Sequence, residues 1–133
     1  LLAVKQSYQQ AGVQADIKPF IDEMAKHYGN ADLVICRAGA LTVAELAAAG
    51  VASILIPFPF AVDDHQTCNA RFLSERGAAL LLPQSELSAE KLAQMLHDLT
   101  REELSVMAQH ARSVARADAA QRVAQVCAEL AET

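Results

Sequence analysis

The sequence lacks several features that mark whole classes of proteins. No apolar run approaches the roughly 18 residues that a membrane-spanning helix needs, and no signal peptide is recognisable at its start. Basic residues are in the minority, with 11 Lys and Arg against 16 Asp and Glu and a net charge of −5, so there is no basic field for nucleic acid. We therefore expect a cytosolic chain that neither spans the membrane nor binds nucleic acid.

Cysteine and histidine are sparse, and neither forms a recognisable metal motif. The three cysteines are odd in number, far apart and each set in an apolar run, which favours reduced, buried thiols and no disulfide. These are Cys36, Cys68 and Cys127. Three of the four histidines, His27, His97 and His110, fall on separate predicted helices without metal-ligand spacing. We expect no metal and no other cofactor.

What is present suits one globular α/β domain. The 133 residues are 53% hydrophobic and 20% charged, which is enough apolar material for a core. Short β-branched or leucine-rich runs alternate with helical patterns that end at glycine. The expected strands cover residues 15–18, 33–36, 53–56 and 79–82. The expected connecting helices cover residues 22–28, 42–49 and 65–75, and helices alone follow Pro83. Right-handed crossovers then give a Rossmann-like parallel sheet with flanking helices.

In such a sheet the ligand crevice lies at the carboxyl ends of the strands, so the loops that leave the strands are the candidate site. The loop Arg37-Ala38-Gly39-Ala40 has small residues and runs into a helix whose free N–H groups suit a phosphate. It is neither a Walker loop nor a dinucleotide fingerprint.

The start of the helix that follows this loop has two interpretations. Thr42 and Glu45 have the spacing of a capping box, which needs no ligand. Alternatively, Glu45 accepts hydrogen bonds from the two hydroxyls of a ribose. The sequence leaves both open.

The loop from Pro57 to His65 is aromatic, then acidic. Asp63 and Asp64 are expected to cap the next helix, on which Gln66 and Asn69 share a face. Two amides on one face suit sugar hydroxyls, although a solvated surface is the alternative. His65 is placed for acid–base work, but no nucleophile motif accompanies it.

Five segments together resemble the carboxyl-terminal half of the MurG-type bacterial N-acetylglucosaminyltransferases. They are Phe20-Ile21, Cys36 to Glu45, Ala49-Gly50, Pro57 to Thr67 and Asn69-Ala70. The resemblance implies a GT-B glycosyltransferase, in which the second domain holds the UDP sugar and the first faces the membrane and the lipid acceptor. Residues 1–133 would then be the donor-binding domain, incomplete at its amino-terminal side and without the acceptor domain.

The resemblance also implies roles for particular residues. The backbone at Ile21 meets the uracil, and Gln66 hydrogen-bonds the sugar. The residues around ribose and diphosphate are Ala40, Leu41, Thr42, Val43, Ala44 and Glu45. His65 and Asn69 are second-tier candidates. A glycine-rich phosphate loop, an arginine near the uracil and the catalytic base are expected to precede Leu1, so no catalytic residue is assigned here and transfer by this chain alone is not expected.

The implied reaction is inverting transfer of N-acetylglucosamine from UDP-N-acetylglucosamine to undecaprenyl-diphosphate-linked muramoyl pentapeptide, for peptidoglycan synthesis. It would take place at the cytoplasmic face of the bacterial inner membrane, with peripheral attachment through the missing domain. Two alternatives stay open. One is another UDP-sugar enzyme of the same fold, and the other is a non-catalytic nucleotide-binding or partner-binding module.

Overall fold

The computed structural model describes residues 1–60 and 62–131, so Ala61 of the third loop lies outside the described residues. Its helices are α1 (Leu2–Gln10), α2 (Met24–Asn30), α3 (Ala40–Ala49), α4 (His65–Ser74), α5 (Ala89–Asp98), α6 (Arg101–Ser113) and α7 (Ala119–Ala131). Its strands are β1 (Leu33–Cys36), β2 (Ala52–Leu55) and β3 (Ala79–Leu81). Two 3-10 turns, η1 (Val62–Asp64) and η2 (Gln84–Glu86), precede α4 and α5.

The three strands form one parallel sheet in the order β1-β2-β3. Leu33 pairs with Ala52, and Ser53 pairs with Ala79. The fourth expected strand, over residues 15–18, is wrong, because this segment has no regular structure and pairs with no described strand. Its sequence, Ala-Asp-Ile-Lys, offers only Ile17 as a large apolar side chain, and that residue is half-buried.

The core lies on both faces of β2, the central strand, all four residues of which are buried. Successive side chains of a strand point to opposite faces. Leu55 packs with Leu46 of α3 and Leu73 of α4. Ile54 packs on the other face with Leu92 of α5 and its neighbours. The expected Rossmann-like parallel sheet with flanking helices on both faces is confirmed.

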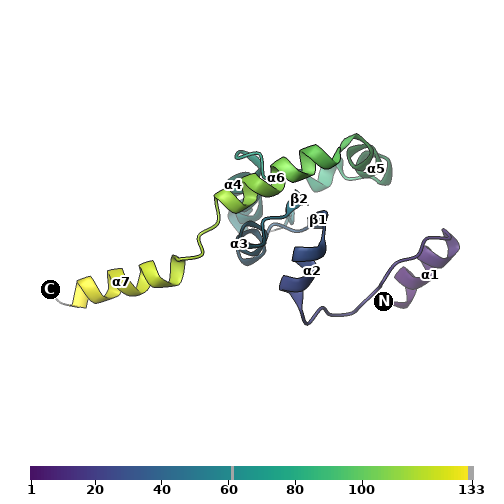
Figure 1. Cartoon of the computed structure of the whole chain (residues 1–133). Coiled ribbons are helices and arrows are strands. Elements are labelled where there is room, and N and C mark those ends of the chain that lie inside the picture. The colour runs from purple at the N-terminus through teal and green to yellow at the C-terminus, as the bar shows by residue number, and fades with distance from the viewer. Residues whose placement is uncertain (61, 132–133) are drawn as a thin grey trace.

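The two terminal helices differ from this body. Figure 1 shows α1 and α7 lying to either side of the sheet and the helices that cover it, at the ends of extended connections. Neither helix has a buried residue. None of the helices in the described part of the chain is both long and apolar enough to cross a bilayer.

Candidate functional site

Two side-chain amides of α4 fix the loop that leaves β1. The Oε1 atom of Gln66 accepts hydrogen bonds from the N–H groups of Ala38 at 3.2 Å and Phe58 at 2.8 Å. The Nδ2 atom of Asn69 donates to the carbonyl oxygen of Ala38 at 3.0 Å. Ala38 is therefore held through both its N–H and its C=O, and its own side chain is fully buried. The two amides share a face as predicted, but the alternative of a solvated surface is wrong for both, because each contacts backbone.

This anchored loop sets where α3 begins. Gly39 is the N-cap residue, in an extended conformation, and α3 starts at Ala40 rather than at the expected Thr42. No described side chain caps this end, and the first turn contains no acidic residue. The first N–H groups of α3 therefore face the carboxyl edge of the sheet without a capping partner, together with the positive end of the helix dipole. Ala40 and Leu41 are exposed there, and Thr42 is half-buried.

The shifted start contradicts the capping-box interpretation of Glu45. A capping glutamate would be the third residue after the N-cap, whereas Glu45 is the sixth residue of α3. Its Oε2 atom instead accepts a hydrogen bond from the Tyr28 hydroxyl of α2 at 3.4 Å. Burial, followed by the negative charge of Glu45, raises the pKa of Tyr28. A cavity of about 290 Å³ lies beside this pair, between α2 and α3.

The other predicted site residues, Val43, Ala44 and Ile21, differ in burial and in their distance along the chain from the start of α3. Val43 is buried in the core, so only its backbone could reach a ligand, whereas Ala44 is exposed. Ile21 is half-buried in the irregular segment before α2. No hydrogen bond recorded within residues 1–60 and 62–131 joins Ile21 to α3 or α4.

Contrary to expectation, the two aspartates before α4 do not cap this helix with their side chains in the described part of the chain. Asp64 occupies the N-cap position, but its carboxylate accepts from the Thr67 hydroxyl at 2.6 Å and makes no cap bond to a described backbone N–H. Asp63 and Asp64 both have positive φ, 56° and 53°, a conformation that few residues other than glycine adopt. His65, the first residue of α4, is exposed.

Arg37 is a residue of this edge that sequence reasoning did not single out by itself. Its Nη1 atom donates to the carbonyl oxygens of Ile56 and Pro57, both at 3.3 Å. Its guanidinium carbon lies 5.7 Å from the centre of the Phe58 ring. Arg37 thus joins the loop after β1 to the loop after β2. An Arg directly after an apolar strand and an aromatic loop after the next strand were the available signals.

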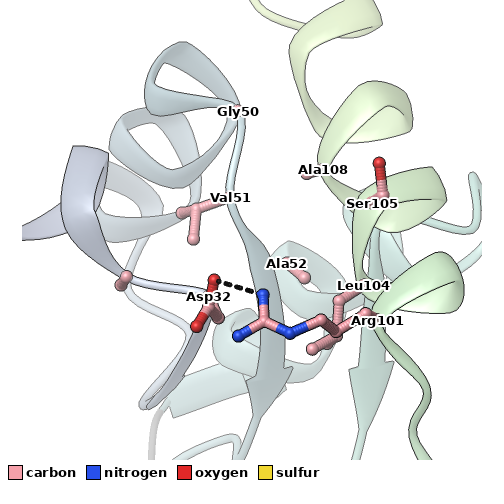
Figure 2. A pocket seen from close by; sticks show the side chains of 9 residues that line it. Asp32, Gly50, Val51, Ala52, Arg101, Leu104, Ser105 and Ala108 are labelled. Atoms are coloured by element: carbon pink, nitrogen blue, oxygen red, sulfur yellow. Dashed lines mark ion pairs between the residues drawn. The ribbon is translucent and has the colours of Figure 1, made fainter.

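A second hollow lies at the opposite, amino-terminal edge of the sheet. Its volume is about 240 Å³, and Figure 2 shows the Arg101 side chain reaching from α6 toward Asp32, just before β1. The Arg101 Nη1 atom lies 3.5 Å from the Asp32 Oδ1 atom, and both side chains are mostly exposed. An exposed pair of this kind contributes little to stability. Ligands of α/β sheets bind at the other edge.

A parallel α/β sheet with an uncapped helix start at its carboxyl edge is the arrangement that phosphate-binding α/β domains share. Comparison with known proteins narrows this class. Residues 1–126 match the sequence profile described as the glycosyltransferase family 28 C-terminal domain. The chain belongs to glycosyltransferase family 28.

Its relatives are consistent in name. The chain is 62% identical over 130 residues to the UDP-N-acetylglucosamine--N-acetylmuramyl-(pentapeptide) pyrophosphoryl-undecaprenol N-acetylglucosamine transferase of Azoarcus sp. (strain BH72), covering 98% of this chain and 36% of the relative. It is 60% identical over 133 residues to the enzyme of the same name from Nitrosomonas eutropha, covering 100% and 38%. The crystal structure of Acinetobacter baumannii MurG matches with a TM-score of 0.88 and 47% identity, covering 94% of this chain and 37% of that one. The chain thus spans less than two-fifths of the length of these proteins.

Proposed function

We propose that residues 1–133 are the donor-binding domain of an inverting glycosyltransferase of peptidoglycan synthesis. The enzyme would transfer N-acetylglucosamine from UDP-N-acetylglucosamine to undecaprenyl-diphosphate-linked muramoyl pentapeptide. The names of the relatives support the reaction. The observation that carries the site is the start of α3, where uncapped N–H groups lie at the carboxyl edge of the sheet and the Glu45 carboxylate follows within two turns of the same helix.

The proposed binding mode follows from the charge of each group. The N–H groups of Ala40, Leu41 and Thr42 bind the diphosphate and stabilise the negative charge that develops on UDP as it leaves. Glu45 accepts hydrogen bonds from the ribose hydroxyls, and the backbone of Val43 and Ala44 completes this part of the pocket. Ile21 contacts the uracil through its backbone.

Gln66 is proposed to recognise the sugar through the other end of its amide. Its Oε1 atom already accepts two backbone hydrogen bonds. An amide nitrogen has two donors, so Nε2 is the atom suited to a sugar hydroxyl. The contacts of Oε1 fix the orientation of the amide, which lowers the entropic cost of binding.

Acceptor binding, the catalytic base and peripheral attachment to the cytoplasmic face of the inner membrane are proposed to lie in the part of the relatives that this chain does not match. Chemistry within residues 1–133 is then limited to holding and polarising the donor, which needs no metal or other cofactor in this proposal. His65 and Asn69 are kept as secondary candidates. Asn69 would act through Ala38, whose carbonyl oxygen it binds.

Isothermal titration calorimetry with UDP, UDP-N-acetylglucosamine and UDP-glucose tests this function. We expect wild type to bind UDP-N-acetylglucosamine more tightly than UDP-glucose. Gln66→Ala should weaken UDP modestly, because the anchored loops loosen, and should weaken UDP-N-acetylglucosamine about tenfold more, because one sugar hydrogen bond is also lost. An equal loss for both ligands would rule out the sugar contact. Equal affinity of wild type for UDP-N-acetylglucosamine and UDP-glucose would favour another UDP-sugar enzyme of this fold. Absence of UDP binding by the whole proposed enzyme, of which residues 1–133 are the donor-binding domain, would reject the proposal.

A further inference from the structure

Tyr28 is the one side chain of the described residues that is recorded in a hydrogen bond with Glu45. Its ring packs against the part of the core that contains Leu46, Leu55 and Leu73. This packing fixes the position of the hydroxyl beside Glu45. Both residues are half-buried. Seventeen positions separate them in sequence, and the contact depends on α2 lying against α3.

Glu45 needs such a partner in order to keep one orientation. A glutamate side chain has several rotatable bonds, and ordering it costs entropy. The capping contact that could have fixed it locally is not formed, because α3 begins at Ala40. A single hydrogen bond from a hydroxyl uses one of the roughly four lone-pair positions of a carboxylate. The other positions stay available for two further donors.

We propose that Tyr28 is a positioning residue for ribose recognition, whose hydroxyl holds the Glu45 carboxylate ready to accept hydrogen bonds from the ribose hydroxyls of a uridine nucleotide. This inference rests on the proposed function, because it assumes the ribose role of Glu45. The 3.4 Å separation is long for an O–H···O hydrogen bond, and such contacts commonly shorten when the ligand binds.

Two further observations support the proposal. Tyr28 is protonated at neutral pH even at its ordinary pKa of 10.0, and burial and the adjacent negative charge raise that pKa further, so the hydroxyl acts as a donor to Glu45. The cavity beside the pair is lined by Met24, Ala25, Ala48 and Ala49 as well as by Tyr28 and Glu45. Its other walls are apolar side chains that offer the carboxylate no competing side-chain donor.

The test compares two ligands by calorimetry of the whole proposed enzyme. One is UDP, and the other is its dideoxyribose analogue, which lacks both ribose hydroxyls. Tyr28→Phe removes one oxygen and keeps the packed ring. We expect it to weaken UDP about 3- to 10-fold and to leave the affinity for the analogue unchanged. Glu45→Gln should weaken UDP more, again without affecting the analogue, and Tyr28→Phe should have no further effect in that background. The matched control is Tyr8→Phe, at the only other tyrosine, which lies on α1.

The outcomes separate this inference from the proposed function. If Tyr28→Phe weakens UDP and the analogue equally, or weakens neither, Tyr28 does not act through the ribose and the inference is wrong. If Glu45→Gln still selectively weakens UDP in that experiment, the ribose role of Glu45 stands alone. If Glu45→Gln does not distinguish the two nucleotides, the ribose role fails and the inference fails with it. A loss for Tyr28→Phe that persists undiminished in the Glu45→Gln background also overturns it.

Discussion

The chain contains two segments with the same Thr-x-x-Glu pattern, and they have different structures. At Thr100 the pattern forms a complete capping box: Thr100 N–H donates to Glu103 Oε2 at 2.8 Å, and Glu103 N–H donates to Thr100 Oγ1 at 3.2 Å. At Thr42 neither bond exists among the described atoms, because both residues lie inside α3. Glu103 therefore stabilises the start of α6. Within the described structure Glu45 takes no part in a cap, and its carboxylate contacts Tyr28 of α2 instead.

The difference comes from contacts distant in sequence. Thr100 follows an extended residue, Leu99, and begins α6 with hydrogen bonds to Glu103, three residues away. The loop before α3 is instead fixed by Gln66 and Asn69, which bind Ala38 from α4. That anchoring starts the helix two residues before Thr42. A local motif therefore gives a cap only where no tertiary contact places the helix start elsewhere, and the displaced motif is the one at the candidate site.

The largest expected effect contrasts the two glutamates in ligand binding. Glu45→Ala should weaken UDP about 10- to 100-fold, since hydrogen bonds to a charged acceptor are each worth about 1.5–3 kcal/mol. Its effect on the free energy of unfolding should be small. Glu103→Ala should leave UDP affinity unchanged and lower the free energy of unfolding. Calorimetry and urea denaturation measure the two quantities, and a similar loss of UDP affinity in both variants would contradict the distinction.

The contrast between the two threonines is smaller and concerns stability. Thr100→Ala removes the N-cap acceptor of α6 and should lower the free energy of unfolding by about 1 kcal/mol. Thr42→Ala should change it by less than about 0.5 kcal/mol, because Thr42 caps nothing and alanine favours the helix interior. Urea denaturation of both variants at neutral pH measures the difference. Equal losses would mean that Thr42 caps α3 in solution, and the helix start at Ala40 would then be wrong.

The same distinction between local and distant contacts explains what the sequence could predict. The runs at 33–36, 53–56 and 79–82 correspond to β1, β2 and β3, because short apolar segments between helices favour strands of a parallel sheet. β2 is buried at every residue, whereas Ile35 of β1 is exposed. The segment at 15–18 resembled them in length, but a strand also needs a neighbour, and the sequence did not reveal that this one has none in the described structure. The glycine that ends α3, Gly50, was predicted because a left-handed residue, here with φ of 64°, is a local requirement.

The site was predictable in outline and not in detail. Strand order places the loops after β1 and β2 at one edge, so Glu45, Gln66 and the start of α3 could be expected near one another. The partners of Gln66 and Asn69 could not, because helical spacing shows which residues share a face and not what that face contacts. The contact between Tyr28 and Glu45 has the same origin, since it depends on how α2 packs on α3.

The smallest expected effect is on the pH dependence of the free energy of unfolding. It again distinguishes Glu45 from Glu103, because Glu45 has a titratable partner in Tyr28. The pKa of Tyr28 in the folded chain is raised above its ordinary value of 10.0 by burial and by Glu45. The unfolded chain therefore releases this proton first as the pH rises, and the free energy of unfolding falls between the ordinary and the raised pKa. Below the ordinary pKa the contribution of Tyr28 to stability is fully present. In urea denaturation across this alkaline range, Tyr28→Phe should show a shallower decline than wild type, whereas Tyr8→Phe and Glu103→Ala keep the slope of wild type. A Tyr28→Phe profile parallel to wild type would show that the pKa of Tyr28 is not raised in the folded chain, either by burial or by Glu45.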